Sequence, residues 1–149
     1  MYKDALRAAW AEINITNLDF NIKQIKEKVG SGVKITGVVK ADAYGHGSVR
    51  VATVLRANGI ESFAAATLSE AVRLRKAGFL LEEIMVLSPI PEPYIDTIIE
   101  HRLSPVVCDY KNAEAISKAA AAAGIIIKGY IAVDTGMGRI GYSDDVTSV

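Results

Sequence analysis

The chain alternates short apolar runs with segments whose apolar residues recur at helical spacing. This alternation is the feature that most restricts the fold, because consecutive strands joined through a helix lie parallel in one sheet. Strands that are covered on both faces read as continuous apolar runs, as these do. The sequence therefore predicts an α/β fold built from right-handed βα units on a parallel sheet.

Each predicted element is bounded by capping residues or glycines. Buried strands are predicted at residues 34–39, 63–66, 84–87, 105–107 and 125–133, after a strand-like stretch at residues 8–13. Helices are predicted at residues 16–29, 48–58, 68–78, 91–101 and 112–123. The predicted caps are Thr16, Ser48 and Asp109, together with a capping box formed by Thr67 and Glu70.

Two architectures can be built from five βα units. A doubly wound, flavodoxin-like sheet is complete at about this length, whereas an eight-stranded barrel typically needs about 250 residues. Length alone favours the doubly wound sheet. The chain of 149 residues, however, ends shortly after Gly141, and no helix follows the last predicted strand. We therefore expect a truncated chain.

Composition excludes several classes of protein. The 17 Lys and Arg are balanced by 17 Asp and Glu, which leaves no basic surface for nucleic acid and no polybasic patch for a membrane. No apolar run approaches the roughly 20 residues of a membrane span, and the N-terminus carries charges where a secretory signal is apolar. Cys108 is the single cysteine, and the two histidines stand apart, so neither a disulfide framework nor a metal site is expected. We expect a cytoplasmic protein.

The first segment that can carry chemistry is VVKADAYGHG at residues 38–47. Lys40 ends a buried strand, where ligands collect in α/β folds, and a glycine-rich loop follows it. A nucleophilic amine near pH 7 needs a pKa well below the usual value of about 10.4, and its product would be a Schiff base with a carbonyl cofactor such as pyridoxal phosphate. The alternative is a lysine whose head pairs with Asp42 at the rim. Tyr44 can instead pack on the loop with its hydroxyl in water, and His46 is predicted to be a hydrogen-bonding loop residue rather than a catalyst.

The second segment is VDTGMGRIG at residues 133–141. It contains the letters G-x-G-x-x-G, but a dinucleotide site needs this pattern at the start of a helix with an acidic residue about 20 positions further on, and the chain ends first. Arg139 on such a loop can hold a carboxylate or an aromatic oxyanion through two parallel hydrogen bonds. The alternative is a solvent-facing arginine, with Asp134 and Thr135 as turn residues.

Three segments together resemble alanine racemase: AWAEIN at residues 9–14, VKADAYGHG at 39–47 and DTGMGRIG at 134–141. They stand in the family's order and spacing, and the likeness spans essentially the whole chain. The resemblance implies a TIM-type (β/α)8 barrel that binds pyridoxal 5'-phosphate, here truncated after about five strands. Residues 1–149 would be the N-terminal portion of that barrel domain, and residues 1–15 the strand that joins an absent C-terminal β domain.

The resemblance also implies roles for single residues. Lys40 matches the Schiff-base lysine, which is one of the family's two catalytic bases. Tyr44 matches a tyrosine that contacts the cofactor's phosphate, and Arg139 the arginine near the cofactor's phenolic oxygen and the substrate carboxylate. The other base is a tyrosine of the C-terminal domain, supplied across a head-to-tail homodimer. Ala132 stands where many members have a lysine, often carbamylated, so the resemblance leaves open which group steadies Arg139 here.

The leading hypothesis is a pyridoxal-phosphate-dependent racemase, with alanine as its small-molecule substrate and a homodimer as its complete form. Because proton transfer is needed on both faces of the substrate, we expect the fragment alone to be inactive. The alternatives are a racemase for serine or another amino acid, a barrel protein that holds pyridoxal phosphate without turnover, and a flavodoxin-like binding domain. Residues 9–14 argue against the single-domain barrel, because they resemble the strand that joins the β domain.

Overall fold

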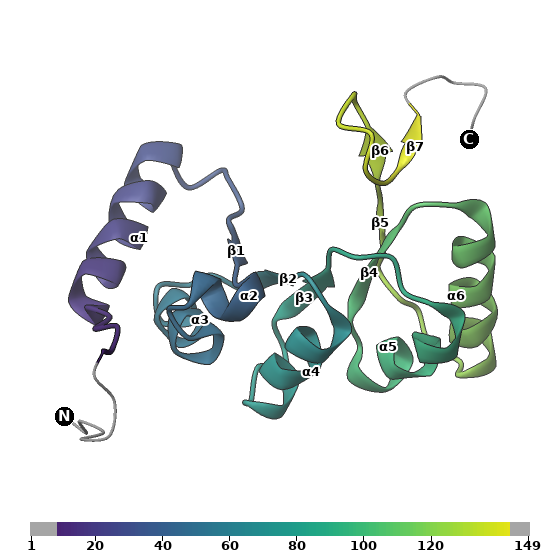
Figure 1. The fold of residues 1–149 in the computed structure, drawn as a ribbon, viewed down its shortest axis with the longest axis horizontal. Helices are drawn as coiled ribbons and strands as arrows, with labels where there is room; N and C mark the ends of the chain where they lie inside the picture. Colours follow the sequence, from purple (N-terminus) through teal and green to yellow (C-terminus); the bar gives the residue numbers. More distant parts are fainter. Residues whose placement is uncertain (1–8, 144–149) are drawn as a thin grey trace.

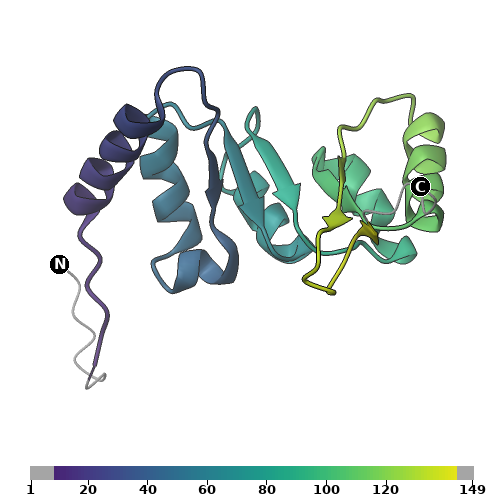
Figure 2. The same cartoon turned by 90° about the horizontal axis from the view of Figure 1, so that it is seen from above.

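The computed structural model describes residues 9–143, and its main feature is a sheet of five parallel strands. The neighbours in the sheet follow chain order, β1-β2-β3-β4-β5 (Figures 1 and 2). A flavodoxin-like sheet would have the order 2-1-3-4-5, so the doubly wound alternative is wrong and the barrel-type arrangement of βα units is confirmed. The strands are β1 (Thr36–Val38), β2 (Ser62–Ala65), β3 (Glu83–Val86), β4 (Ser104–Val107) and β5 (Tyr130–Ile131).

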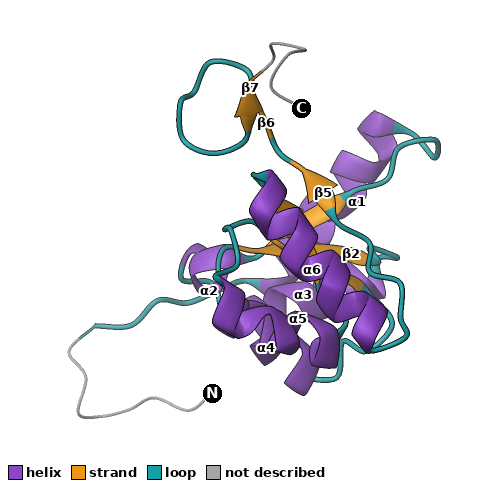
Figure 3. Ribbon diagram, turned by 90° about the vertical axis from the view of Figure 1, so that its right-hand side faces the viewer, coloured by secondary structure: helices purple, strands orange, loops and turns teal. Residues whose placement is uncertain are grey.

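Helices α3, α4 and α5 lie on one side of this sheet (Figure 3). In Figure 3, α3, α4 and α5 lie below the strands, while the pair formed by β6 (Val133–Asp134) and β7 (Tyr142–Ser143) stands above them. The sheet therefore has one covered face and one open face. None of the helices in the described part of the chain is long and apolar enough to cross a membrane. The helices are α1 (Ile15–Val29), α2 (Lys40–Tyr44), α3 (Ser48–Ala57), α4 (Leu68–Lys76), the 3₁₀ helix η1 (Glu92–Tyr94), α5 (Ile95–His101) and α6 (Tyr110–Ala122).

The core lies between the sheet and these helices, because alternate strand residues point toward the helices. Phe63 and Phe79 pack edge to face with ring centres 5.4 Å apart, and both are fully buried. Gly37 of β1 leaves room for this layer, since a Cβ there would lie 2.6 Å from Cδ1 of Leu55. The next residue, Val38, points to the open face and stays exposed. The open face is thus partly apolar.

Arg75 of α4 ties several turns of the chain together. Backbone carbonyl groups at the ends of α4 and α5 have no partner within their own helices. The guanidinium of Arg75 donates to such carbonyls and to neighbouring turns, and burial lowers its pKa. One side chain therefore connects two helices and the entry to β3. The acceptors are the backbone oxygens of Phe79, Glu82, His101 and Arg102.

Local capping patterns predict the starts of α4 and α6 correctly. Thr67 and Glu70 form the predicted capping box at the start of α4. Asp109 caps α6, and its Oδ1 accepts the N–H of Asn112 at 2.8 Å. Both patterns act within three residues of sequence, so they are readable without knowledge of the fold.

The N-terminal segment differs from the prediction. Residues 9–14 do not form a strand, and Ala8 lies outside the described residues. A strand needs a partner, and the sheet between residues 9 and 143 places none beside this segment. Helix α1 begins after Asn14 rather than after Thr16, because Oδ1 of Asn14 accepts the N–H of Asn17 at 3.0 Å and Asn14 has the extended backbone of a cap.

The last predicted strand, at residues 125–133, is wrong in extent. Only Tyr130–Ile131 pairs with β4, and Val133–Asp134 pairs with β7 instead. Pro105 of β4 has no N–H to donate, and the ladder between β4 and β5 begins after it, at Val106. Residues 125–129 of the predicted strand consequently pair with no strand.

Candidate active site

Lys40 lies at the carboxyl end of β1. One residue, Val39, separates it from the strand, and Lys40 begins the short helix α2. Val39, the residue before Lys40, is still hydrogen-bonded to the neighbouring strand β2: its N–H donates to the backbone oxygen of Ala64 at 2.9 Å. The carboxyl ends of parallel strands are the usual place for ligands in α/β folds. Lys40 therefore has the position of a ligand-binding side chain.

The backbone after Lys40 forms a left-handed helical turn rather than an irregular glycine loop. This conformation costs a non-glycine residue about 1–2 kcal/mol. A run of such residues persists only where the surroundings hold it, and strain of this kind is concentrated at functional sites. Four consecutive non-glycine residues adopt it here with φ between 51° and 53°: Ala41, Asp42, Ala43 and Tyr44.

Asp42 binds the start of α3 rather than Lys40. Its Oδ1 accepts hydrogen bonds from the backbone N–H (2.8 Å) and the hydroxyl (3.0 Å) of Ser48, and Arg73 lies 3.3 Å away. These hydrogen bonds, with a smaller contribution from Arg73, hold the pKa of Asp42 below its usual value. The alternative in which Asp42 pairs with Lys40 is therefore wrong. Ser48 is the first residue of α3 rather than its cap, a position taken by Gly47.

Tyr44 and His46 lie at the end of the turn. Nζ of Lys40 is 6.0 Å from the centre of the Tyr44 ring, which is exposed. Nδ1 of His46 lies 3.0 Å from the backbone oxygen of Ala43, so His46 is the hydrogen-bonding loop residue that the sequence predicted. The turn thus presents an amine and a phenol side by side.

Arg139 is carried by a tight loop between β6 and β7. Oδ1 of Asp134 accepts the N–H groups of Gly138 and Gly136, both at 3.0 Å, and these bonds lower the pKa of Asp134. The N–H of Tyr142 donates to the backbone oxygen of Ala132 at 2.9 Å and closes the loop. Asp134 is therefore the turn residue that its spacing predicted.

Lys40 and Arg139 line the same pocket, of about 500 Å³, at the carboxyl ends of the strands. Tyr44 is not among its lining residues and lies beside Lys40 at the rim. An amine can react with a carbonyl group, and a guanidinium binds carboxylates or oxyanions through paired hydrogen bonds. The pocket consequently combines two functions that a small anionic molecule with a carbonyl group requires. Its walls include Ala66, Leu87, Ser88, Tyr130 and Ala132.

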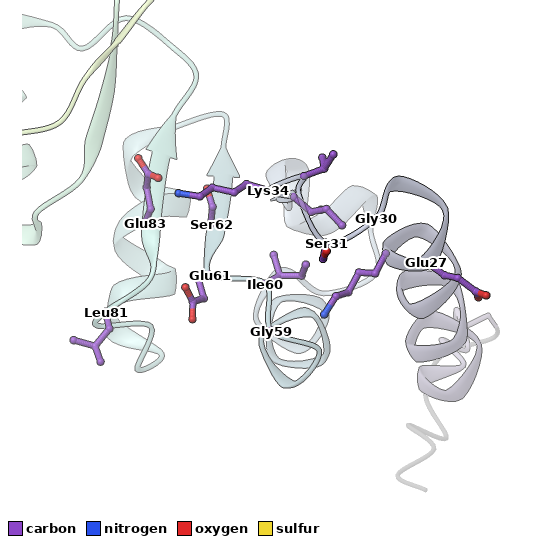
Figure 4. Close-up of a pocket in the computed structure, with 13 residues that line it drawn as sticks. Glu27, Gly30, Ser31, Lys34, Gly59, Ile60, Glu61, Ser62, Leu81 and Glu83 are labelled. Atoms are coloured by element: carbon purple, nitrogen blue, oxygen red, sulfur yellow. The ribbon is translucent and has the colours of Figure 1, made fainter.

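A second pocket, of about 750 Å³, lies at the opposite ends of the strands (Figure 4). Its lining includes Lys34, Ser62 and Glu83, which stand at or before the starts of β1, β2 and β3. Glu83 has a structural role, because its carboxylate accepts hydrogen bonds from Tyr130 and Lys128. In barrel-type folds this end of the strands serves stability, so we place the candidate site at the carboxyl ends.

Two residues of α4 contact the site although the sequence assigned neither to it: Glu70 was predicted only as part of the capping box, and Arg73 was not singled out. Glu70 accepts the N–H of Ala41 at 2.7 Å, and Arg73 pairs with Asp42. Residues three apart share one face of a helix. The sequence could therefore have predicted that Glu70 and Arg73 point to the same side of α4, but not which loop this side contacts.

We expect Gly141→Ala to loosen the loop that carries Arg139. Gly141 has φ of +113°, and a Cβ would lie 2.9 Å from both the Ala132 oxygen and the Asp134 nitrogen. Gly136→Ala is the matched control, because its φ of +118° is equally unfavourable but no atom lies within 4 Å. Hydrogen exchange of residues 130–143 in the full-length protein should be about tenfold faster in Gly141→Ala than in Gly136→Ala. Equal rates would show that the close approach is unimportant.

Comparison with known proteins identifies the family. Residues 13–148 match the family model described as alanine racemase, N-terminal domain. The alanine racemase of Clostridium kluyveri is 48% identical over 143 residues, which cover 96% of this chain and 36% of that protein. The solved alanine racemase of Clostridium difficile 630 in complex with cycloserine is 34% identical with a TM-score of 0.91, over 97% of this chain and 40% of that chain.

A racemase with another named substrate shares the fold. The histidine racemase from Leuconostoc mesenteroides is 29% identical with a TM-score of 0.76, over 87% of this chain and 34% of that chain. The chain thus spans well under half the length of each of these proteins. These matches confirm the resemblance to alanine racemase, and the chain belongs to the family of alanine racemase N-terminal domains.

Proposed function

We propose that this chain is the N-terminal part of a racemase that interconverts L- and D-alanine with pyridoxal 5'-phosphate. The observation that carries the proposal is the shared pocket of Lys40 and Arg139 at the carboxyl ends of the strands. Family membership supports the reaction class, since the relatives that match over nearly the whole chain are alanine racemases. Residues 1–15 would join a C-terminal β domain, and we assign the complete enzyme to the cytoplasm.

The chemistry of the pocket fits pyridoxal 5'-phosphate. The cofactor's aldehyde needs a primary amine, which Lys40 supplies, and its phenolic oxygen needs a donor, which Arg139 supplies. The exposed Tyr44 beside Lys40 offers a hydroxyl to the phosphate. Ala66 and Leu87 are apolar walls against which a flat ring can lie.

Within this site each side chain has a defined task. When bound, pyridoxal phosphate withdraws electrons and makes the α-proton of an amino acid acidic. Nζ of Lys40 removes or returns that proton on one face. Arg139 holds the substrate carboxylate, which fixes the face presented to Lys40. Racemisation also needs a proton-transfer group on the opposite face, which we assign to the partner subunit of a homodimer.

A racemase for a different amino acid is the second candidate. It is favoured by the likeness to a histidine racemase, which shares the fold of this part of the chain. The preferred amino acid is therefore best identified by comparing substrates. L-alanine, L-serine and L-histidine should be offered to the complete racemase, and the D-isomer of each measured. Alanine is expected to be the best substrate, and a higher kcat/KM for either of the others would transfer the assignment.

The proposed site is tested directly by trapping the lysine. We expect sodium borohydride with pyridoxal phosphate to leave a pyridoxyl group on Lys40 when the racemase carrying this chain is mapped by mass spectrometry. Lys34, at the other end of β1, is the internal control and should stay unmodified. A label on another lysine with Lys40 free would overturn the assignment.

A further inference from the structure

Glu70 makes more contacts than a helix cap requires. In an ordinary capping box, the glutamate side chain accepts the N–H of the capping residue, as Oε2 does here from Thr67 at 3.1 Å. The same oxygen also accepts the N–H of Ala66 at 2.8 Å. The other oxygen, Oε1, accepts the N–H of Ala41 at 2.7 Å, across 29 positions of sequence. The carboxylate therefore joins α4, the end of β2 and the residue directly after Lys40.

The contact with Ala41 lies at a strained position. Ala41 is the first residue of the left-handed turn, with φ of 51°. Its neighbour Asp42 is held by Ser48 and Arg73, so the turn is fixed from both sides by α3 and α4. Left-handed backbone is unfavourable for residues other than glycine, so a turn that loses its contacts relaxes to another conformation. Such a change would move Lys40, which is attached to the first peptide of the turn.

A carboxylate suits this position better than any neutral side chain. Both of its oxygens accept hydrogen bonds, and all of the groups that face Glu70 here are N–H donors. The amide of a glutamine can accept on one end only, and its NH2 end would face a donor. Charge-assisted hydrogen bonds of this kind are about twice as strong as neutral ones.

We infer that Glu70 is a positioning residue for Lys40, which it keeps at the pocket by clamping the left-handed turn against α4 and β2. This inference rests on the proposed function of Lys40. Glu70 does not line the pocket, so it acts through Lys40 rather than on the substrate. Small displacements of a reacting group lower rates by up to about 100-fold.

Glu70→Gln and Thr67→Ala separate clamping from capping in the complete racemase with pyridoxal phosphate. Thr67→Ala removes the hydroxyl that accepts the N–H of Glu70 and so weakens the same helix start, without touching the contact with Ala41. For Glu70→Gln we expect kcat with L-alanine to fall roughly 10- to 100-fold with KM changed less than threefold. For Thr67→Ala we expect kcat within twofold of the parent, with a lower melting temperature in both variants.

Hydrogen exchange of the peptide spanning residues 40–47 provides a readout that does not depend on activity. It should accelerate about tenfold or more in Glu70→Gln and remain unchanged in Thr67→Ala. Equal kcat in the two variants, or unchanged exchange in Glu70→Gln, overturns the inference. A parent enzyme that fails to racemise any amino acid overturns the proposed function instead, while the exchange data still decide whether Glu70 holds the turn.

Discussion

Replacing Lys40 with alanine is expected to lower kcat for L-alanine racemisation by about 10⁴-fold. A positioned general base contributes about 10²- to 10⁴-fold, and Lys40 additionally provides the amine that anchors the cofactor. The side chain stands at the carboxyl end of β1, so its removal leaves the buried core layer of Phe63 and Phe79 intact. The variant should therefore fold with nearly the stability of the parent.

Lys34→Ala is the matched control for this experiment. Lys34 and Lys40 flank the same strand, but Lys34 lines the pocket at the opposite end of the sheet (Figure 4). We expect its loss to leave kcat within twofold. The measurement is a coupled assay of D-alanine with both variants saturated in pyridoxal phosphate. Turnover of Lys40→Ala within tenfold of the parent would mean that another amine performs its task.

Arg139→Lys is expected to lower kcat/KM for L-alanine about 100-fold. Lysine keeps the positive charge but cannot donate two parallel hydrogen bonds to a carboxylate or an oxyanion. The loss should fall on both kcat and kcat/KM if the contact strengthens in the transition state. The loop itself is held by Asp134 and the glycines, so this substitution leaves its conformation intact.

Arg56→Lys serves as the control that separates stability from activity. The Arg56 guanidinium stacks on Phe79 at 4.3 Å and lies 3.4 Å from Glu82, away from the candidate pocket. We expect this variant to melt at a lower temperature and to retain kcat/KM within twofold. Steady-state kinetics and thermal unfolding on both variants decide the matter. A similar loss of kcat/KM in Arg56→Lys would show that Arg139 acts only through stability.

Several features were readable from sequence because their causes are local. The capping box of Thr67 with Glu70 and the cap at Asp109 act within three residues. The alternation of apolar runs also predicted the parallel βα units. It left open whether those units build a barrel or a doubly wound sheet, since both architectures repeat the same unit. The resemblance to alanine racemase supported the barrel, and the strand order confirmed it.

What the sequence determined by itself is the succession of parallel βα units and the two segments proposed to carry chemistry. The tertiary structure alone decided that the loop after Lys40 is a left-handed turn, because its strain is offset by Glu70 and Arg73, which lie on a helix reached only after β2. It likewise decided that Arg139 shares a pocket with Lys40. Local propensity describes energies within a few residues, whereas both of these features depend on contacts that exist only once parallel strands bring distant segments to the same end of the sheet.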